Sequence, residues 1–184
     1  CLGVDSAATL TMPDTSANRK AFVTTGEYTV SPGGLSAWDQ YCKDEAIQAG
    51  WGTAQDEFVA LVAPQGEAMI ERLLEANEDY PTLPAGGMWA RVDGVLLAAS
   101  MEDLATGDWL APLSVDAFGT VWRDHVVWTG NASMLGTGGT NCNNWTDTVA
   151  PGNLMHGRTR GVPDTWFIAY TNCSNSHHLY CFQK

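Results

Sequence analysis

The stretch 172–182, NCSNSHHLYCF, holds the residues whose types and spacing best suit chemistry. It places seven residues between Cys173 and Cys181, and His177 and His178 are among them. Cysteine and histidine can bind zinc, which takes four such ligands at a structural site, and a cysteine with a lowered pKa can act as a nucleophile. On a strand, however, adjacent side chains face opposite ways, so both histidines would not bind one ion. We therefore expect a structural stretch, with neither a metal site nor a catalytic site.

The five cysteines are Cys1, Cys42, Cys142, Cys173 and Cys181. Four lie in the body of the chain and one at its first position, which suggests two disulfides and one cysteine left over. Disulfides persist in oxidising compartments, so we expect an extracellular or periplasmic protein, with the outer cell surface included. Cys1 fits three interpretations: a lipidated terminus, half of an intermolecular disulfide, or a fragment boundary. No apolar run approaches the roughly 18 residues of a membrane helix, so only a lipid on Cys1 would attach the chain to a membrane.

A polar segment, residues 129–165, is rich in Gly, Asn, Thr, Asp and Pro and shows little periodicity. A loop of this length in a compact domain is often functional, and binding residues commonly lie on such loops. Its oxygen-bearing side chains, Asp164 among them, could bind calcium without an EF-hand spacing, but Asn and Gly also serve turns. The tryptophans are either ligand anchors or core residues. The candidate ligand-binding residues are Trp128, Asn131, Asn141, Asn143, Asn144, Trp145, Asp147, Arg158 and Arg160; Asn131 and Asn144 are also glycosylation sequons.

The charge of the chain excludes one class of partner. Twenty-one acidic residues against nine basic ones give a net charge of -12 among 184 residues. Such a surface repels nucleic acids and anionic membranes, so nucleic acid is not expected as a partner. The length fits one large domain, or one domain and a tail. Residues 1–20 are small, polar and aperiodic, which predicts a tail or stalk, and residues 21–184 form the expected domain.

The elements that would position these residues follow from apolar periodicity. The clearest is a helix capped by Ser36, with Asp39 in its first turn, Cys42 facing inward and Gly50 at its end. A second helix is predicted over 67–77 and a short one after Ser100, with a hairpin turn at Asp93-Gly94 and another turn near Asp116. Strands are predicted over 21–30, 57–64, 124–130, 165–173 and 177–183. The order predicts an α+β fold, with helices outside an antiparallel sheet.

Several of these motifs also resemble a known family. "GGLSAWDQYCKDEAIQAG", "FVALVA", "HVVWTG", "CNNWT" and "CSNSHHLYCF" are similar, in order and spacing, to bacterial endostatin-like domains. These domains include the leptospiral endostatin-like surface proteins and belong to the C-type lectin-like superfamily. The resemblance covers roughly residues 21–184 and implies that fold, a twisted antiparallel sheet with two flanking helices and a long polar loop. It also implies two disulfides, Cys42–Cys181 and Cys142–Cys173.

The departures from that family narrow the expected function. The acidic surface argues against heparin binding, and no histidine precedes His125 to form the zinc site of endostatin. Trp145 is followed by Thr-Asp, and the calcium-binding Glu-Pro-Asn or Gln-Pro-Asp is missing, which argues against calcium-dependent sugar binding. Paired carboxylates suited to glycan hydrolysis do not stand out. We expect a non-enzymatic extracellular binding module for a matrix protein or glycan, acting through 129–165. The alternative is a structural subunit of an extracellular assembly that self-associates through its tail or Cys1.

Overall fold

The computed structural model describes residues 18–74, 87–139, 141–150, 154–160 and 169–184 as a mixed α+β fold. Cys1, nearly all of the predicted tail and Asp164 lie outside these residues. The elements are β1 (Arg19–Val23), β2 (Tyr28–Thr29), α1 (Gly34–Gln48), β3 (Phe58–Ala60), the 3₁₀ turn η1 (Met69–Leu73), β4 (Trp89–Arg91), α2 (Met101–Thr106), β5 (Val126–Trp128), α3 (Cys142–Trp145), β6 (Leu154–Arg158), β7 (Ala169–Thr171), β8 (Ser176–His177) and β9 (Tyr180–Gln183).

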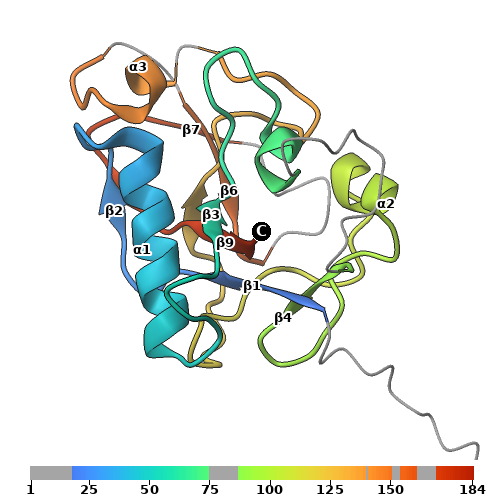
Figure 1. The fold of residues 1–184 in the computed structure, drawn as a ribbon. Helices are drawn as coiled ribbons and strands as arrows, with labels where there is room; N and C mark the ends of the chain where they lie inside the picture. Colours follow the sequence, from blue (N-terminus) through green and yellow to red (C-terminus); the bar gives the residue numbers. More distant parts are fainter. Residues whose placement is uncertain (1–17, 75–86, 140, 151–153, 161–168) are drawn as a thin grey trace, which may run out of the picture.

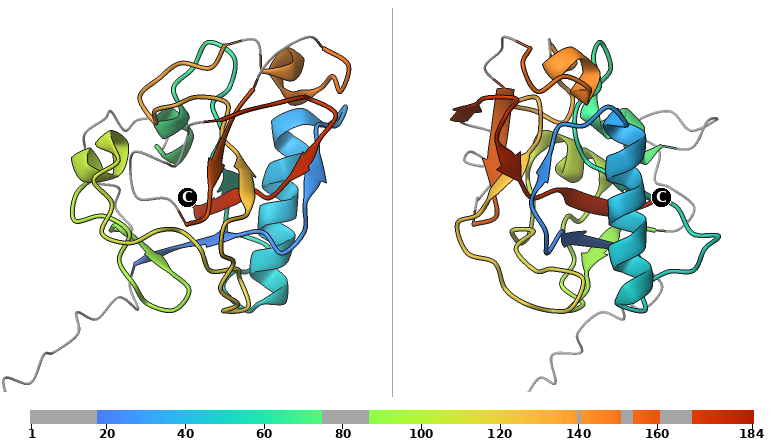
Figure 2. Two further views of the ribbon diagram at one scale, coloured as in Figure 1. Left: turned by 180° about the vertical axis from the view of Figure 1, so that it is seen from behind. Right: turned by 90° about the vertical axis from the view of Figure 1, so that its left-hand side faces the viewer.

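Within the described residues the strands form three small sheets, where the sequence predicts one antiparallel sheet. The central sheet has the order β3-β9-β1-β4, and the other two are β2-β8 and β5-β6-β7. Strand β9 is antiparallel to β1 and β3, whereas β1 and β4 are parallel. A parallel pair is possible here because the long chain between β1 and β4 provides a crossover connection. The rear view in Figure 2 shows β5 and β6 side by side above β1.

The central sheet is covered on both faces. Successive side chains of a strand point to opposite faces, and in β9 Cys181 joins one core cluster whereas Tyr180 and Phe182 join the other. Helix α1 covers the first face through Trp38, Cys42 and other apolar residues. Helix α2 and η1 cover the second face, on the side away from α1 (Figure 1).

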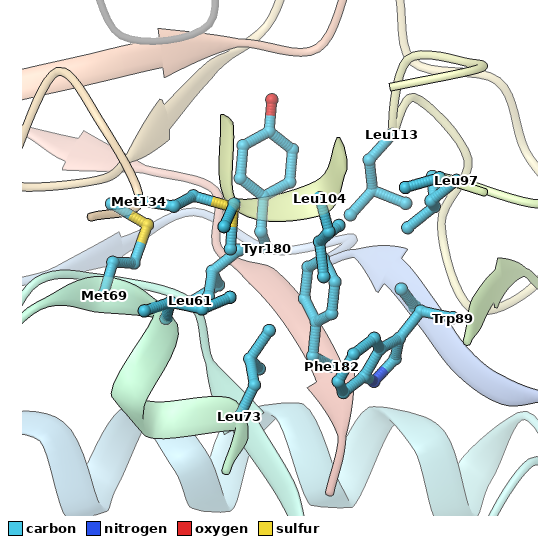
Figure 3. Packing of buried hydrophobic residues seen from close by; sticks show 14 of the residues in the cluster. Leu61, Met69, Leu73, Trp89, Leu97, Leu104, Leu113, Met134, Tyr180 and Phe182 are labelled. Carbon is cyan, nitrogen blue, oxygen red and sulfur yellow. The ribbon is translucent and has the colours of Figure 1, made fainter. Parts of the chain in front are cut away.

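The second cluster is centred on β9. Figure 3 shows Leu61, Met69 and Met134 on one side of Phe182, with Trp89 on the other. The rings of Trp89 and Phe182 meet edge to face, with centroids 5.8 Å apart. Edge-to-face contact suits the charge distribution of aromatic rings and adds to the stabilisation from burial. This core fixes β9, and with it the C-terminal cysteine of the chain.

Helix α1 begins earlier than the sequence predicts. Gly33 is its N-cap, Gly34 has φ +55°, and Ser36 is already inside the first turn. The prediction failed because the turn before the helix closes through a bond from the Gly34 N–H to the Ser31 carbonyl. Asp39 is therefore in the second turn, where its carboxylate pairs with Arg72 and accepts a bond from the Ala60 N–H at 2.8 Å. The predicted end is confirmed, because Gly50 follows the helix at φ +79°.

The predicted helix over 67–77 is wrong for its described part. Only the short turn η1 forms, and Leu74 already has an extended backbone. Its apolar side chains are buried as expected, but the Ile70 N–H donates to the Met134 carbonyl instead of to its own segment. The Arg72 side chain likewise donates to the Ala60 carbonyl, at 2.9 Å. Tertiary contacts thus hold this segment as a short 3₁₀ turn, whereas its apolar periodicity predicts an α-helix.

The other predicted strands are shorter in the structure, and two of them are divided between sheets: 21–30 into β1 and β2, and 177–183 into β8 and β9. Of the predicted strand 165–173, residues 165–168 lie outside the described residues, and β7 lies in the rest. Of the predicted strand 57–64 only β3 is regular, because the Ala63 N–H leaves the sheet to donate to the Thr129 carbonyl. The hairpin turn at Gly94 and the Ser100 cap of α2 are confirmed, the cap by a bond from the Asp103 N–H to Ser100 Oγ at 3.0 Å. The turn at Asp116 is confirmed as well. The polar segment 129–165 is not all loop, since β6 lies within it.

Candidate functional site

Two disulfides connect the elements around the predicted binding loop. Cys42 in α1 is bonded to Cys181 in β9, and Cys142 in α3 is bonded to Cys173 after β7. These are the pairs that the resemblance implies, and all four cysteines are buried. Cys173 and Cys181 therefore belong to different bridges. Two disulfides of this kind indicate an oxidising compartment.

The turn α3 has an unusual backbone. Cys142, Asn143, Asn144 and Trp145 have φ values of 48°, 52°, 53° and 68°, so all four lie in the left-handed region. Asparagine tolerates this region, but for most residues it costs roughly 1–2 kcal/mol each. Strained backbone of this kind persists only where its surroundings hold it, and it clusters at binding sites and ligand clamps.

Buried groups hold α3 in this conformation. Asn141 Nδ2 and Trp145 Nε1 both donate to the Ala63 carbonyl, at 2.6 and 3.0 Å. The indole of Trp145 packs against those of Trp38 and Trp128, with centroids 4.9 and 5.7 Å away, and these two rings also contact each other. The Cys142–Cys173 bridge closes the turn from its other end. The backbone at Gly130 lies very close to Trp145, since a Cβ at this position would be 2.5 Å from the Trp145 ring.

This packing corrects part of the predicted binding set. Trp128, Asn141 and Trp145 are buried, so they support the loop and do not reach a ligand. Asn143 and Asn144 are exposed at the tip of α3, which Figure 1 shows at one end of the molecule. Of the predicted residues in α3, these two are the ones open to solvent.

Backbone N–H groups donate hydrogen bonds to the side-chain oxygens of three predicted residues. Asn131 Oδ1 accepts from the Ser133 N–H and Asp147 Oδ1 accepts from the Val149 N–H. Asn144 Oδ1 accepts from the Gln65 N–H at 3.1 Å. The Asn131 and Asp147 oxygens are engaged in local turns and the Asn144 oxygen in a long-range bond to the backbone, which supports the structural alternative to calcium binding.

Arg158 and Arg160 form a separate group around Asp124. Arg158 Nη1 lies 2.7 Å and Arg160 Nε 3.1 Å from Asp124 Oδ1. The hydrogen bond from Arg158 is the main reason that the pKa of Asp124 is lowered. All three side chains are well exposed, so this ion pairing adds little stability.

A polar cleft of about 260 Å³ lies between α1 and β3, and its lining includes Asp39, Lys43, Glu57 and Phe58. None of the residues predicted to bind a ligand lines it. Both charge signs occur in its wall, and Lys43 already donates to the Ala54 carbonyl at 2.6 Å. The cleft is therefore separate from the α3 turn.

The two adjacent histidines face opposite ways, as their strand spacing predicts. His177 Nε2 lies 2.9 Å from Thr171 Oγ1, and the His177 ring packs against the Trp128 ring. Burial, with smaller effects of His156 and His178, lowers the pKa of His177 to about 4. His178 lies on the other side, where its Nδ1 is 2.8 Å from the Thr24 carbonyl oxygen.

His178 meets two residues that the sequence does not single out. Its Nε2 is 3.2 Å from His125 Nδ1 and 3.6 Å from Glu27 Oε1. One such atom from each of the three residues lies within 4.8 Å of the others. The three come from distant segments, so no local spacing reveals the group. It also lies outside the 129–165 loop.

Comparison with known protein families finds no matching family, and comparison with curated proteins finds no match either. In the part of the chain that the structure describes, no helix has the length and apolar character needed to cross a membrane.

Proposed function

We propose that this chain is a non-enzymatic binding module of an extracellular or surface-exposed bacterial protein, with an endostatin-like variant of the C-type lectin-like fold. The order of the resembling motifs supports the fold, together with the bridges Cys42–Cys181 and Cys142–Cys173. The paired disulfides support the extracellular setting. The segment 129–165 is the proposed binding region.

The left-handed turn α3 is the observation that carries this proposal. It fixes Asn143 and Asn144 in exposed positions on a backbone that a disulfide and the buried Trp145 constrain. A constrained loop loses little conformational entropy on binding, which favours affinity. Purely structural turns rarely need four consecutive left-handed residues, whereas strained segments are common at binding sites.

A protein is the ligand class that the region best fits, and the charge of the whole chain favours one with a basic surface. Val149, two residues after Asp147, is 85% exposed, and Leu135 is 43% exposed. Exposed apolar side chains beside polar ones suit a protein contact. The net charge of -12 attracts a basic macromolecule at long range and speeds association. A glycan is the second class to be tested.

The test is biolayer interferometry of the native protein against immobilised matrix proteins, with a glycan array in parallel. We expect protein binding that strengthens at low ionic strength and weakens several-fold in Val149→Ser and Asn143→Ala. Val121→Ser is the matched control, because Val121 is also exposed but belongs to the Asp116 turn. Blank results on both surfaces, or binding that both loop variants leave unchanged, would overturn the proposal. Binding on the array alone would assign a glycan.

A further inference from the structure

We propose that Glu27, His125 and His178 form a binding site for one divalent transition-metal ion, with zinc the best fit. The site takes a nitrogen from each histidine and an oxygen from the carboxylate, a ligand set that zinc accepts. The proposal is independent of the 129–165 loop and of any ligand bound there.

Three segments converge to build the site. The His178 N–H donates to the Val126 carbonyl at 3.1 Å, and the Leu179 N–H donates to Thr24 Oγ1 at 2.9 Å. His178 is thereby held between the start of β5 and the end of β1. Glu27 precedes β2, which pairs with the strand that ends next to His178. The backbone thus brings all three side chains together without any bound ion.

The distances between ligand atoms suit a tetrahedral ion. Zinc bonds of about 2.0–2.2 Å at tetrahedral angles place neighbouring ligand atoms roughly 3.3–3.5 Å apart. The separations from His178 Nε2 are 3.2 Å to His125 Nδ1 and 3.6 Å to Glu27 Oε1. The third separation, between the ligand atoms of His125 and Glu27, lies within 4.8 Å. The distance to Glu27 is too long for a hydrogen bond.

The tautomer of His178 also suits a ligand. Its Nδ1 is 2.8 Å from the Thr24 carbonyl oxygen, which can only accept a hydrogen bond, so Nδ1 carries a proton. In the neutral ring Nε2 then carries a lone pair, which faces Glu27 and accepts a hydrogen bond from His125 Nδ1 in the absence of an ion. A metal-binding histidine almost always donates its other ring N–H to a carboxylate, a backbone carbonyl or water.

The surroundings fix the rings and leave an entrance. Trp122 contacts the rings of both His125 and His178, with centroids 4.7 and 5.1 Å away. Its indole is itself anchored to Asp116 Oδ2 by a 2.8 Å hydrogen bond. The His178 side chain is 2% exposed but that of Glu27 is 55% exposed. An ion can therefore enter beside Glu27, and its fourth position would face solvent and take water.

The experiment is isothermal titration of zinc chloride into native protein that carries no polyhistidine tag and has been dialysed against chelator. We expect one zinc ion per chain and an affinity at least ten-fold lower in Glu27→Gln and His125→Gln. His156→Gln is the matched control, because His156 is another of the four histidines and lies outside the site. The control should bind zinc like the native protein.

Thermal melting and a second ion supply independent readouts. Zinc should raise the Tm of the native protein and of His156→Gln, but not that of His125→Gln. Cobalt should give the visible absorption of a tetrahedral site in the same two proteins. His178→Gln is avoided because His178 is buried and bonded to Thr24. No zinc binding, binding retained in both site variants, or equal loss in His156→Gln would each overturn the proposal.

Discussion

The indole of Trp145 donates a hydrogen bond to the Ala63 carbonyl across 82 residues of sequence, and the two atoms are 3.0 Å apart. This bond connects the strained turn α3 to the chain that leaves β3. Because Asn141 Nδ2 donates to the same oxygen, Ala63 joins both sides of the turn. The binding loop therefore depends on the core of the domain for its shape.

Trp145→Phe should lower the free energy of unfolding by about 1–3 kcal/mol. The change removes a buried hydrogen bond and part of a fully buried ring, although Asn141 still satisfies the Ala63 oxygen. Urea unfolding followed by circular dichroism measures the loss. Trp51→Phe is the matched control, since Trp51 donates to the Ala117 carbonyl but is only half-buried. A loss no larger than that of the control would contradict the support role of Trp145.

The left-handed backbone of α3 predicts a particular order of stability at Asn143. Asn143→Ala should cost roughly 1 kcal/mol, because alanine is strained at φ +52°. Asn143→Gly should be nearly neutral, because glycine reaches that region freely. Guanidinium unfolding of the two variants compares them directly at one exposed position. Equal stability of the two would show that Asn143 is not left-handed in solution.

The two disulfides should differ in their contribution. The bridge Cys42–Cys181 spans 139 residues and Cys142–Cys173 spans 31. Loop-closure entropy then predicts a cost of about 4–5 kcal/mol for removing the first and about 3–4 kcal/mol for the second. Paired cysteine-to-serine variants, compared by urea unfolding, measure this order. The shorter bridge holds α3, so its removal should also reduce ligand binding, and a larger global loss from it would contradict the entropic account.

Sequence patterns predicted burial and turns better than strand pairing. The apolar run at 58–64 is buried, as predicted, because burial depends on residue type at each position. Its regular strand is shorter, because the bond from the Ala63 N–H to the distant Thr129 carbonyl redirects the chain. The Ser100 cap and the Gly94 turn were predictable because both depend on neighbouring residues.

The site residues illustrate the same limit. Asn143 and Asn144 were predicted as candidates because they lie in a conspicuous polar segment, but composition alone did not separate these exposed residues from the buried Asn141. The contact between His125 and His178 depends on how β5 meets the chain before β9, which no local pattern encodes. The adjacency of His177 and His178 predicted only that their side chains point to opposite faces of a strand.

The histidine on β6 should make the protein less stable in acid. Burial is the main cause that lowers the pKa of His156, and the charge of Arg158 acts in the same direction. His156 is therefore neutral in the folded protein, whereas in the unfolded chain it takes up a proton near its ordinary pKa of 6.5. Its contribution to stability is complete above pH 6.5 and is lost as the pH falls from 6.5 towards the lowered value.

His156→Gln removes this proton uptake, so the free energy of unfolding of the variant should fall less between pH 7 and pH 5. One proton changes the slope by at most about 1.4 kcal/mol per pH unit. Urea unfolding at half-unit steps, in buffer with chelator, measures both curves. Between pH 7 and pH 8.5 the curves should run parallel, which separates lost packing from lost titration. If the difference in free energy of unfolding between the two proteins stayed constant down to pH 5, His156 would bind its proton equally well in the folded and unfolded states. The fold would then not hold His156 neutral.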